Sequence, residues 1–197
     1  MTRSITFAAG AALALALAAC DRPAEVNADN ATGNATAENI DMGNNLVGNE
    51  TAAVVAMAAA DFASTIAASD MFEIESGKLA AEKGTSAEIK DFGTMLQADH
   101  KKSTDELKAA GAKAEPAITP APTLTGEQQA NLDKLKAASG AEFDRMFAEQ
   151  QVAAHQKALD ALRAYSAGGD AQPLREFATK AATVVEGHLE KARGLAT

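Results

Sequence analysis

Residues 72–110, FEIESGKLAAEKGTSAEIKDFGTMLQADHKKSTDELKAA, decide the fold of this chain. Apolar residues recur in this stretch every three or four positions, which is the period of an amphipathic helix. Gly84 ends one helix, and Thr85-Ser86-Ala87-Glu88 has the pattern of a capping box that opens the next. Two helices joined by so short a turn are expected to pack as an antiparallel hairpin.

Residues that start and stop helices also occur outside this stretch, and no alternating strand pattern appears after residue 50. Thr125 and Gln128 form a capping box for a short helix, and Ser139 and Glu142 form one for the helix that follows. Asp170 is expected to cap the last helix. The expected helices cover residues 52–83, 86–110, 125–138, 139–167 and 170–193.

The connection in the middle of the chain decides the topology. Residues 112–124, AKAEPAITPAPTL, contain three prolines and are excluded from a helix interior. This segment can extend on the order of 40 Å, which is about the length of a bundle. The sequence therefore predicts an all-α domain over residues 52–197, a ferritin-like four-helix bundle with one long crossover connection, in preference to an up-down-up-down bundle.

The N-terminal residues carry an export signal. Residues 1–19 have a cationic start at Arg3 and an apolar run too short for a comfortable membrane span, which predicts a signal peptide. The run ends in Leu17-Ala18-Ala19-Cys20, the pattern of a bacterial lipobox, so Cys20 is expected to be lipidated. The alternative is an ordinary signal peptide with a chance cysteine.

Residues 20–51 follow as a polar linker, rich in Asn and acidic residues, which cannot bury enough apolar surface to fold and is expected to be disordered. The chain is thus expected in the bacterial cell envelope, attached to a membrane through Cys20 and facing the periplasm. The choice between the inner and the outer membrane stays open.

Composition excludes several classes of function. The formal net charge of the 197 residues is -9, which argues against a nucleic-acid partner. Cys20 is the only cysteine, which excludes a disulfide framework and a thiolate zinc cluster. No nucleophile elbow, phosphate loop or HExxH motif occurs, and no motif indicates a particular protein partner.

The three histidines of the chain fall on three different expected helices. His100 lies four residues after Leu96, on the apolar face of its helix. His188 lies seven residues after Ala181 and also faces inward. His155 lies toward the edge of its apolar stripe.

Glu73, seven residues after Ile66, places a carboxylate on the buried face of the first helix, where it needs a partner. Asp144 and Gln151 are further polar residues expected near the core. Imidazoles and a carboxylate are ligand types that a metal site in a bundle core uses. The candidate ligands for one divalent metal ion are therefore Glu73, His100, His155 and His188. The alternative is that the histidines are core residues bonded to neighbouring groups.

The positions of these residues along the bundle axis limit how many of them can bind the same ion. Counted from the top of the bundle at 1.5 Å per residue, the four candidate groups lie at levels that differ by roughly 6 to 13 Å. This arithmetic predicts that a subset, such as His100 with Glu73, binds the ion instead of all four residues together.

About residues 60–195 resemble the bacterial domain-of-unknown-function family 4142, which belongs to the ferritin-like clan. The matching elements are the EI…GKLA run with Glu73, the ADH triplet ending in His100, the FDRMF run with Asp144, the VAAH element with His155 and the HL pair with His188. The resemblance implies a four-helix fold and an envelope location, and it implies no settled activity.

Iron-binding relatives in that clan pair a Glu with a Glu-x-x-His motif on each half of the bundle. Here Gln97 and Val185 stand three residues before His100 and His188. Glu149 and Glu186 point away from the apolar stripes of their helices. A di-iron centre and ferritin-like iron oxidation are therefore not expected.

The sequence favours a lipid-anchored envelope bundle that acts by binding, of a metal or of a protein partner, in envelope or stress physiology. One alternative is a metal-dependent enzyme of the ferritin-like clan that uses Glu73 and the core histidines. Another is a purely structural lipoprotein whose histidines belong to the core.

Overall fold

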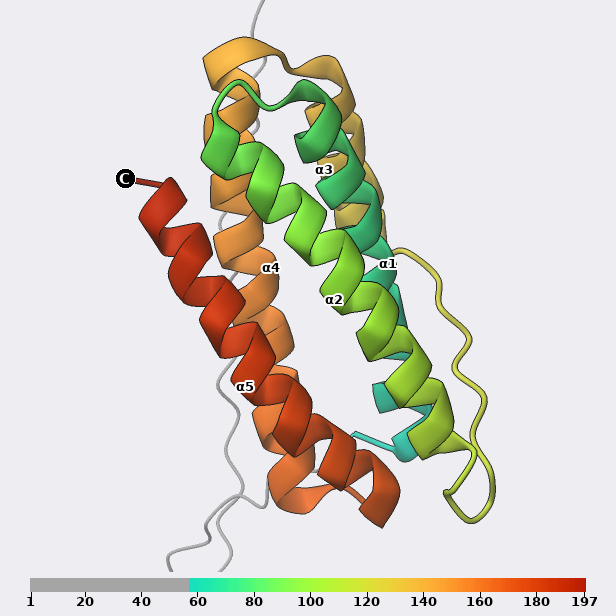
Figure 1. The fold of residues 1–197 in the computed structure, drawn as a ribbon. Helices are drawn as coiled ribbons and strands as arrows, with labels where there is room; N and C mark the ends of the chain where they lie inside the picture. Colours follow the sequence, from blue (N-terminus) through green and yellow to red (C-terminus); the bar gives the residue numbers. More distant parts are fainter. Residues whose placement is uncertain (1–56) are drawn as a thin grey trace, which may run out of the picture. The chain divides into compact units, whose positions relative to one another are not determined.

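The computed structural model describes residues 57–197, and this part of the chain is helical without strands, which confirms the predicted all-α class (Figure 1). Its helices are α1 (Ala59–Lys83), α2 (Ala87–Gly111), α3 (Gly126–Ala137), α4 (Gly140–Gly168) and α5 (Gln172–Leu195). The predicted signal peptide 1–19, the linker 20–51 with Cys20, and residues 52–56 of the first expected helix lie outside the described residues.

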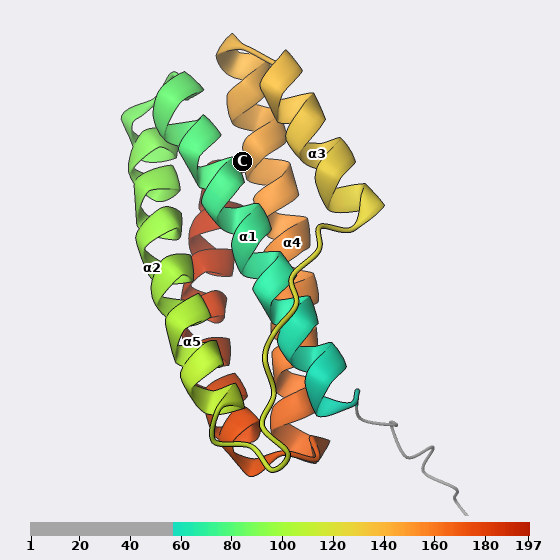
Figure 2. The same cartoon turned by 90° about the vertical axis from the view of Figure 1, so that its right-hand side faces the viewer.

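The helices form two antiparallel hairpins that pack against each other. α1 pairs with α2 and α4 pairs with α5, while α2 also contacts α5 and α1 contacts α4. In Figure 1, α2 ends at the lower end of the bundle and α4 begins at the upper end. The intervening segment travels the length of the bundle, with α3 packed beside α1 and α4 (Figure 2). The predicted ferritin-like order with one long crossover is confirmed.

In the first hairpin, α1 and α2 pack closely at two glycines. A methyl group on Gly77 would lie 2.6 Å from the carbonyl oxygen of Gly93, and one on Gly93 would lie 2.6 Å from the carbonyl oxygen of Gly77. A side chain at either position would push the helices apart. Because the helices are antiparallel, two turns beyond this crossing place Asp70 of α1 opposite His100 of α2.

The predicted helix caps have mixed outcomes. Thr125 forms the expected capping box with Gln128. The N-cap of α2 is Ser86, one residue after the predicted Thr85. Ser139 is the N-cap of α4, as predicted, but without the predicted capping box, and the predicted cap at Asp170 is wrong because Ala171 is the N-cap of α5. The Ser139 side chain makes no cap hydrogen bond, and Gly140 follows it at a φ of 63°, where the chain turns into α4. Asp170 instead accepts a hydrogen bond from a tyrosine hydroxyl.

Two apolar clusters form the core, one toward each end of the bundle. One includes Phe62, Leu107 and Leu162, and the other includes Phe92, Leu96 and Phe147. Along each of α1, α2 and α4, buried polar residues separate the residues of one cluster from those of the other. The buried polar residues are Asp70, Glu73, Ser76, His100, Gln151, His155 and His188. A polar layer of this kind inside an apolar core requires its own explanation.

Within residues 57–197, no helix combines the length and apolar character that crossing a bilayer requires.

Candidate metal centre

The three histidines converge in the polar layer, one from each of α2, α4 and α5. Their ring centroids are 5.4 to 5.7 Å apart, and one nitrogen from each ring lies within 4.8 Å of the other two. His100 is 5 % exposed, His155 1 % and His188 5 %. The structure therefore buries His155 as deeply as its partners, although the sequence places it at the edge of its stripe.

The predicted offset in depth between the histidines is wrong. α4 has 29 residues and α5 has 24, and α5 begins at the lower turn where α4 ends, so α5 ends below the top of the bundle (Figure 1). Counting from the C-terminal end of α5 placed His188 too high. Counted from the shared turn, His155 lies 13 residues before the end of α4 and His188 lies 16 residues after the start of α5.

Each histidine uses one ring nitrogen to contact an acceptor on the outer side of the cluster. Nδ1 of His100 is 2.8 Å from Oδ1 of Asp70, and Nε2 of His188 is 3.0 Å from Oδ2 of Asp99. Nδ1 of His155 is 2.9 Å from the carbonyl oxygen of Gln151. A carbonyl oxygen and an ionised carboxylate only accept hydrogen bonds, so these ring nitrogens carry the protons. In the neutral imidazoles the other three nitrogens then have free lone pairs.

Those other nitrogens have no partner. Nε2 of His100, Nε2 of His155 and Nδ1 of His188 are buried and make no hydrogen bond within the described residues. A buried polar atom left unsatisfied costs about 1–3 kcal/mol. Three such atoms gathered in one place are therefore a marked destabilisation unless something binds them.

The protonation of the triad is uneven. Burial, together with the nearby cationic forms of His100 and His188, lowers the pKa of His155 to about 3. Burial also lowers the pKa of His188, and the hydrogen bond that His188 donates to Asp99 opposes this shift. Burial acts to lower the pKa of His100 too, but its hydrogen bond to Asp70 and the neighbouring carboxylates outweigh burial and raise it. His155 and His188 are thus held neutral, the state in which imidazole binds a metal.

Glu73 lies beside the triad and not among its unpaired nitrogens. Its Oε1 is 3.8 Å from Nδ1 of His155, the nitrogen that faces Gln151. The Glu73 side chain is 1 % exposed, and neither of its oxygens makes a hydrogen bond in this part of the structure. Burial raises the pKa of Glu73 to about 7, and the positive charge of His100 opposes the shift. The four predicted ligands therefore separate into three converging histidines and an adjacent buried carboxyl group.

The two other predicted core residues occupy different places. Gln151 is fully buried, and its Nε2 donates to Oγ of Ser76 at 3.1 Å. Asp144 is not in the core, which corrects the sequence prediction. It lies partly exposed at the turn between α1 and α2, where its carboxylate accepts hydrogen bonds from the backbone amides of Thr85 and Ser86 at 2.9 to 3.2 Å.

Two carboxylates of the centre were missed in the sequence. Asp70 lies three residues before Glu73, and that spacing on a helix shows that the two share a face. Asp99 precedes His100 directly, yet it bonds His188, 89 residues away. No local pattern predicts that second contact, because it depends on how α2 packs against α5.

The donor set limits the chemistry of the centre. Three imidazole nitrogens suit copper, zinc, nickel or iron ions and are a poor match for calcium or magnesium. The glutamates that a di-iron site would need lie on the surface. Glu149 pairs with Arg145, and Glu186 pairs with Arg163. These positions confirm the prediction that Glu149 and Glu186 point away from the core.

The fold and the site thus define a four-helix bundle with a buried three-histidine cluster. The profile of the family described as Domain of unknown function (DUF4142) matches residues 47–195, so the chain belongs to this family. No curated protein matches the chain.

Two solved structures share the fold. "CopM in the Cu(I)-bound form" is 15 % identical, with a TM-score of 0.58, over 70 % of this chain and 94 % of that one. "CopM in the Cu(II)-bound form" is 16 % identical, with a TM-score of 0.61, over 71 % of this chain and 96 % of that one. At this level of identity the likeness concerns the fold alone.

Proposed function

We propose that this protein binds one divalent transition-metal ion in the core of its bundle, through Nε2 of His100, Nε2 of His155 and Nδ1 of His188. One observation carries the proposal. Each histidine directs one ring nitrogen to an outer acceptor and leaves the other unpaired, and the three rings meet in one place.

The pattern favours a metal centre over a packed core of histidines. Metal-binding histidines almost always donate their second ring N–H to a carboxylate or a backbone carbonyl, which fixes the tautomer and the ring orientation. Asp70, Asp99 and the Gln151 carbonyl supply those acceptors here. A histidine that only fills space has no need to leave a buried nitrogen unpaired beside two other histidines.

Copper(II) is the ion that we infer first, with zinc(II) second. For a fixed set of nitrogen ligands, divalent affinities rise to a maximum at copper and then fall at zinc. The two CopM structures that share this fold were solved with copper bound. Their low identity makes this support for the proposal and not a transfer of their sites.

Copper titration of chelator-treated protein tests the proposal. We expect one tightly bound equivalent in the wild type and at least a 100-fold loss of affinity in His155→Ala, on the order of what one lost ligand costs. Leu159→Ala is the matched control, because Leu159 is buried one turn further along the same helix and holds no ligand atom. Its affinity should stay within a few-fold of the wild type. Copper binding that His155→Ala leaves intact would contradict the site.

We further propose that the bundle is held at a membrane of the bacterial envelope by a lipid on Cys20, facing the periplasm, and that it acts by binding its ion and not by catalysis. The support is the sequence Leu17-Ala18-Ala19-Cys20 and the polar residues 20–51. Wild-type protein is expected in the detergent phase of a phase separation, and Cys20→Ser, which removes the lipidated thiol, in the aqueous phase. A Cys20→Ser protein that still enters the detergent phase would show another anchor.

A further inference from the structure

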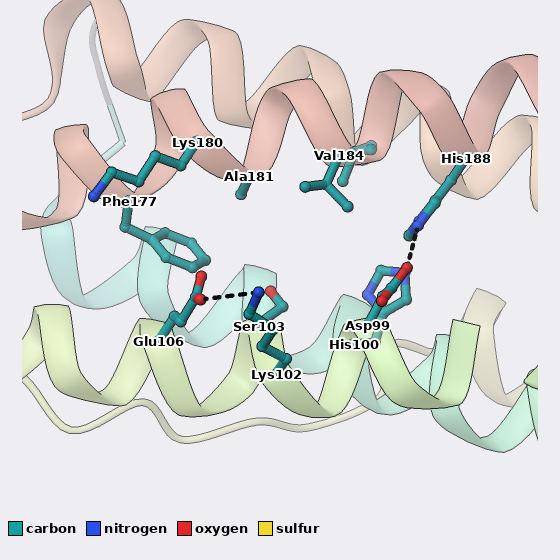
Figure 3. Close-up of a pocket in the computed structure, with 11 residues that line it drawn as sticks. Asp99, His100, Lys102, Ser103, Glu106, Phe177, Lys180, Ala181, Val184 and His188 are labelled. Carbon is teal, nitrogen blue, oxygen red and sulfur yellow. Dashed lines mark hydrogen bonds and ion pairs between the residues drawn. The ribbon is translucent and has the colours of Figure 1, made fainter. Parts of the chain in front are cut away.

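A groove between α2 and α5 leads from the surface to the histidine cluster. It has a volume of about 290 Å³, and His100, His188 and Asp99 are among its lining residues. Figure 3 shows these three side chains at one end of the groove, with Phe177 and Lys180 toward the other. His155 does not line it. An ion held by the triad is therefore approached from the side of His100 and His188.

Within residues 57–197, the cluster offers such an ion one nitrogen from each of three histidines and no fourth ligand. Glu73 lies at the Nδ1 edge of His155, and Asp99 is engaged with Nε2 of His188. A copper or zinc ion with three protein ligands keeps at least one position for an outside donor. The groove is the route by which a small molecule can reach that position.

The charged side chains around the groove balance one another, so the charge of a bound ion determines which ligands the groove favours. Lys102 and Lys180 stand against Asp99 and Glu106, so the lining has two positive and two negative side chains. Neutral imidazoles add no negative charge, and the single charge of Asp70 behind His100 offsets only part of the charge of a divalent ion. A bound divalent cation is often the largest local charge in a site, and here it would favour an anion.

Part of the groove wall on α5 is apolar. Phe177, Ala181 and Val184 line it, and Val184 is 49 % exposed although it is a large aliphatic residue. A ligand that lies along this wall gains by having a short hydrocarbon part behind its donor atom. The groove thus combines an ion at one end with an apolar surface beside it.

We propose that this groove binds a small organic anion, a short-chain carboxylate, whose oxygen coordinates the metal ion as its fourth ligand. The inference rests on the proposed metal binding. The carboxylate displaces water from the ion, and its alkyl chain packs on Ala181 and Val184.

Titration of copper(II)-loaded protein with acetate, propionate and butyrate, followed by the visible and electron paramagnetic resonance spectra of the ion, tests the inference. We expect a saturable spectral change, with affinity rising by up to about fourfold for each methylene that becomes buried. Ala181→Trp fills the groove and should weaken butyrate at least about tenfold. Ala161→Trp is the matched control, since Ala161 is also a half-buried alanine but lines a different pocket, beside α3.

A second pair of variants tests the charge argument without filling the groove. Lys180→Glu should weaken butyrate several-fold at low ionic strength. Lys134→Glu makes the same change of net charge on exposed α3 and should leave the affinity unchanged. Copper affinity is measured first for every variant. Wild-type protein that binds no copper would overturn the proposed function and this inference together. Copper-loaded protein that shows no butyrate response, or an equal response in Ala181→Trp, would overturn this inference alone.

Discussion

Two polar regions of the bundle, one partly buried at the lower turn and one fully buried in the middle, differ in how their hydrogen bonds are completed. At the lower end, the Tyr165 ring stacks on Phe62 with centroids 3.8 Å apart, and its hydroxyl donates to Oδ1 of Asp170 at 2.9 Å. The same hydroxyl accepts from the amide of Ala171 at 3.3 Å. The amide of Ala59 donates to the other oxygen of Asp170 at 3.5 Å. This cluster joins α1, α4 and α5 with its polar atoms paired.

The polar layer in the middle is the opposite case. Within the described residues, the buried side-chain atoms without partners belong mainly to Glu73 and the three histidines, and otherwise to Gln150 and Gln151. A completed polar cluster contributes to stability, whereas an incomplete one lowers it and persists where a ligand completes it. This difference supports a structural role for the Tyr165 end and the proposed metal binding in the middle.

Tyr165→Ala is expected to have the largest effect on stability. Loss of a fully buried aromatic ring should lower the free energy of unfolding by about 3–5 kcal/mol, measured by denaturant titration. Tyr165→Phe keeps the ring and should cost only about 1–2 kcal/mol. Copper affinity should be the same in both variants as in the wild type. A loss of copper affinity in Tyr165→Phe would show that the two regions are not independent.

Glu73→Gln should change the pH dependence of stability in metal-free protein. The pKa of Glu73 is about 7 in the folded chain against 4.5 for the ordinary group, so the folded state holds an extra proton between these values. Wild-type stability then falls as pH rises from about 4.5 to 7, by on the order of 3 kcal/mol from this group.

Gln cannot ionise, so the stability of Glu73→Gln relative to the wild type should rise by that amount between pH 4.5 and pH 8. Equilibrium unfolding in the presence of chelator at both pH values measures the difference. The wild type at each pH serves as the control, because the histidines titrate in both proteins. A difference that stays constant with pH would show that Glu73 does not titrate in the core.

Asp70→Asn should weaken copper binding by about 10- to 100-fold, or about 1.4–2.7 kcal/mol, because it removes the charged acceptor that orients His100. Asp99→Asn should have a smaller effect, since the Asp99 side chain is 40 % exposed where that of Asp70 is 3 % exposed. Competition with a copper chelator measures both. Wild-type affinity in Asp70→Asn would indicate that the carboxylate does not support the site.

Asp144→Ala should have the smallest effect, a loss of about 1 kcal/mol in the free energy of unfolding with no change in copper affinity. The carboxylate accepts from the Thr85 and Ser86 amides before α2, as a helix cap does. Asp133→Ala on exposed α3 is the control and should change stability by less than about 0.5 kcal/mol. A larger loss of copper affinity than of stability would place Asp144 in the binding function.

Much of the architecture was readable from local patterns. Gly84 and the proline-containing segment 112–124 marked where helices end, because these residues act on their own backbone. The inward faces of Glu73, His100 and His188 followed from helical spacing alone. Helix caps were predicted less well from the sequence. Asp170, for example, accepts a hydrogen bond from Tyr165 and does not cap α5.

The sequence by itself determined the helices, their order and the faces that His100, His188 and Glu73 present, because each depends on residues within a few turns of one another. Only the tertiary structure decided that three histidines meet, that Asp70 and Asp99 orient two of them, and that Glu73 stands aside. Those contacts depend on the register between helices. The close approach of Gly77 and Gly93 and the shared lower turn of α4 and α5 set that register, and no single helix encodes it.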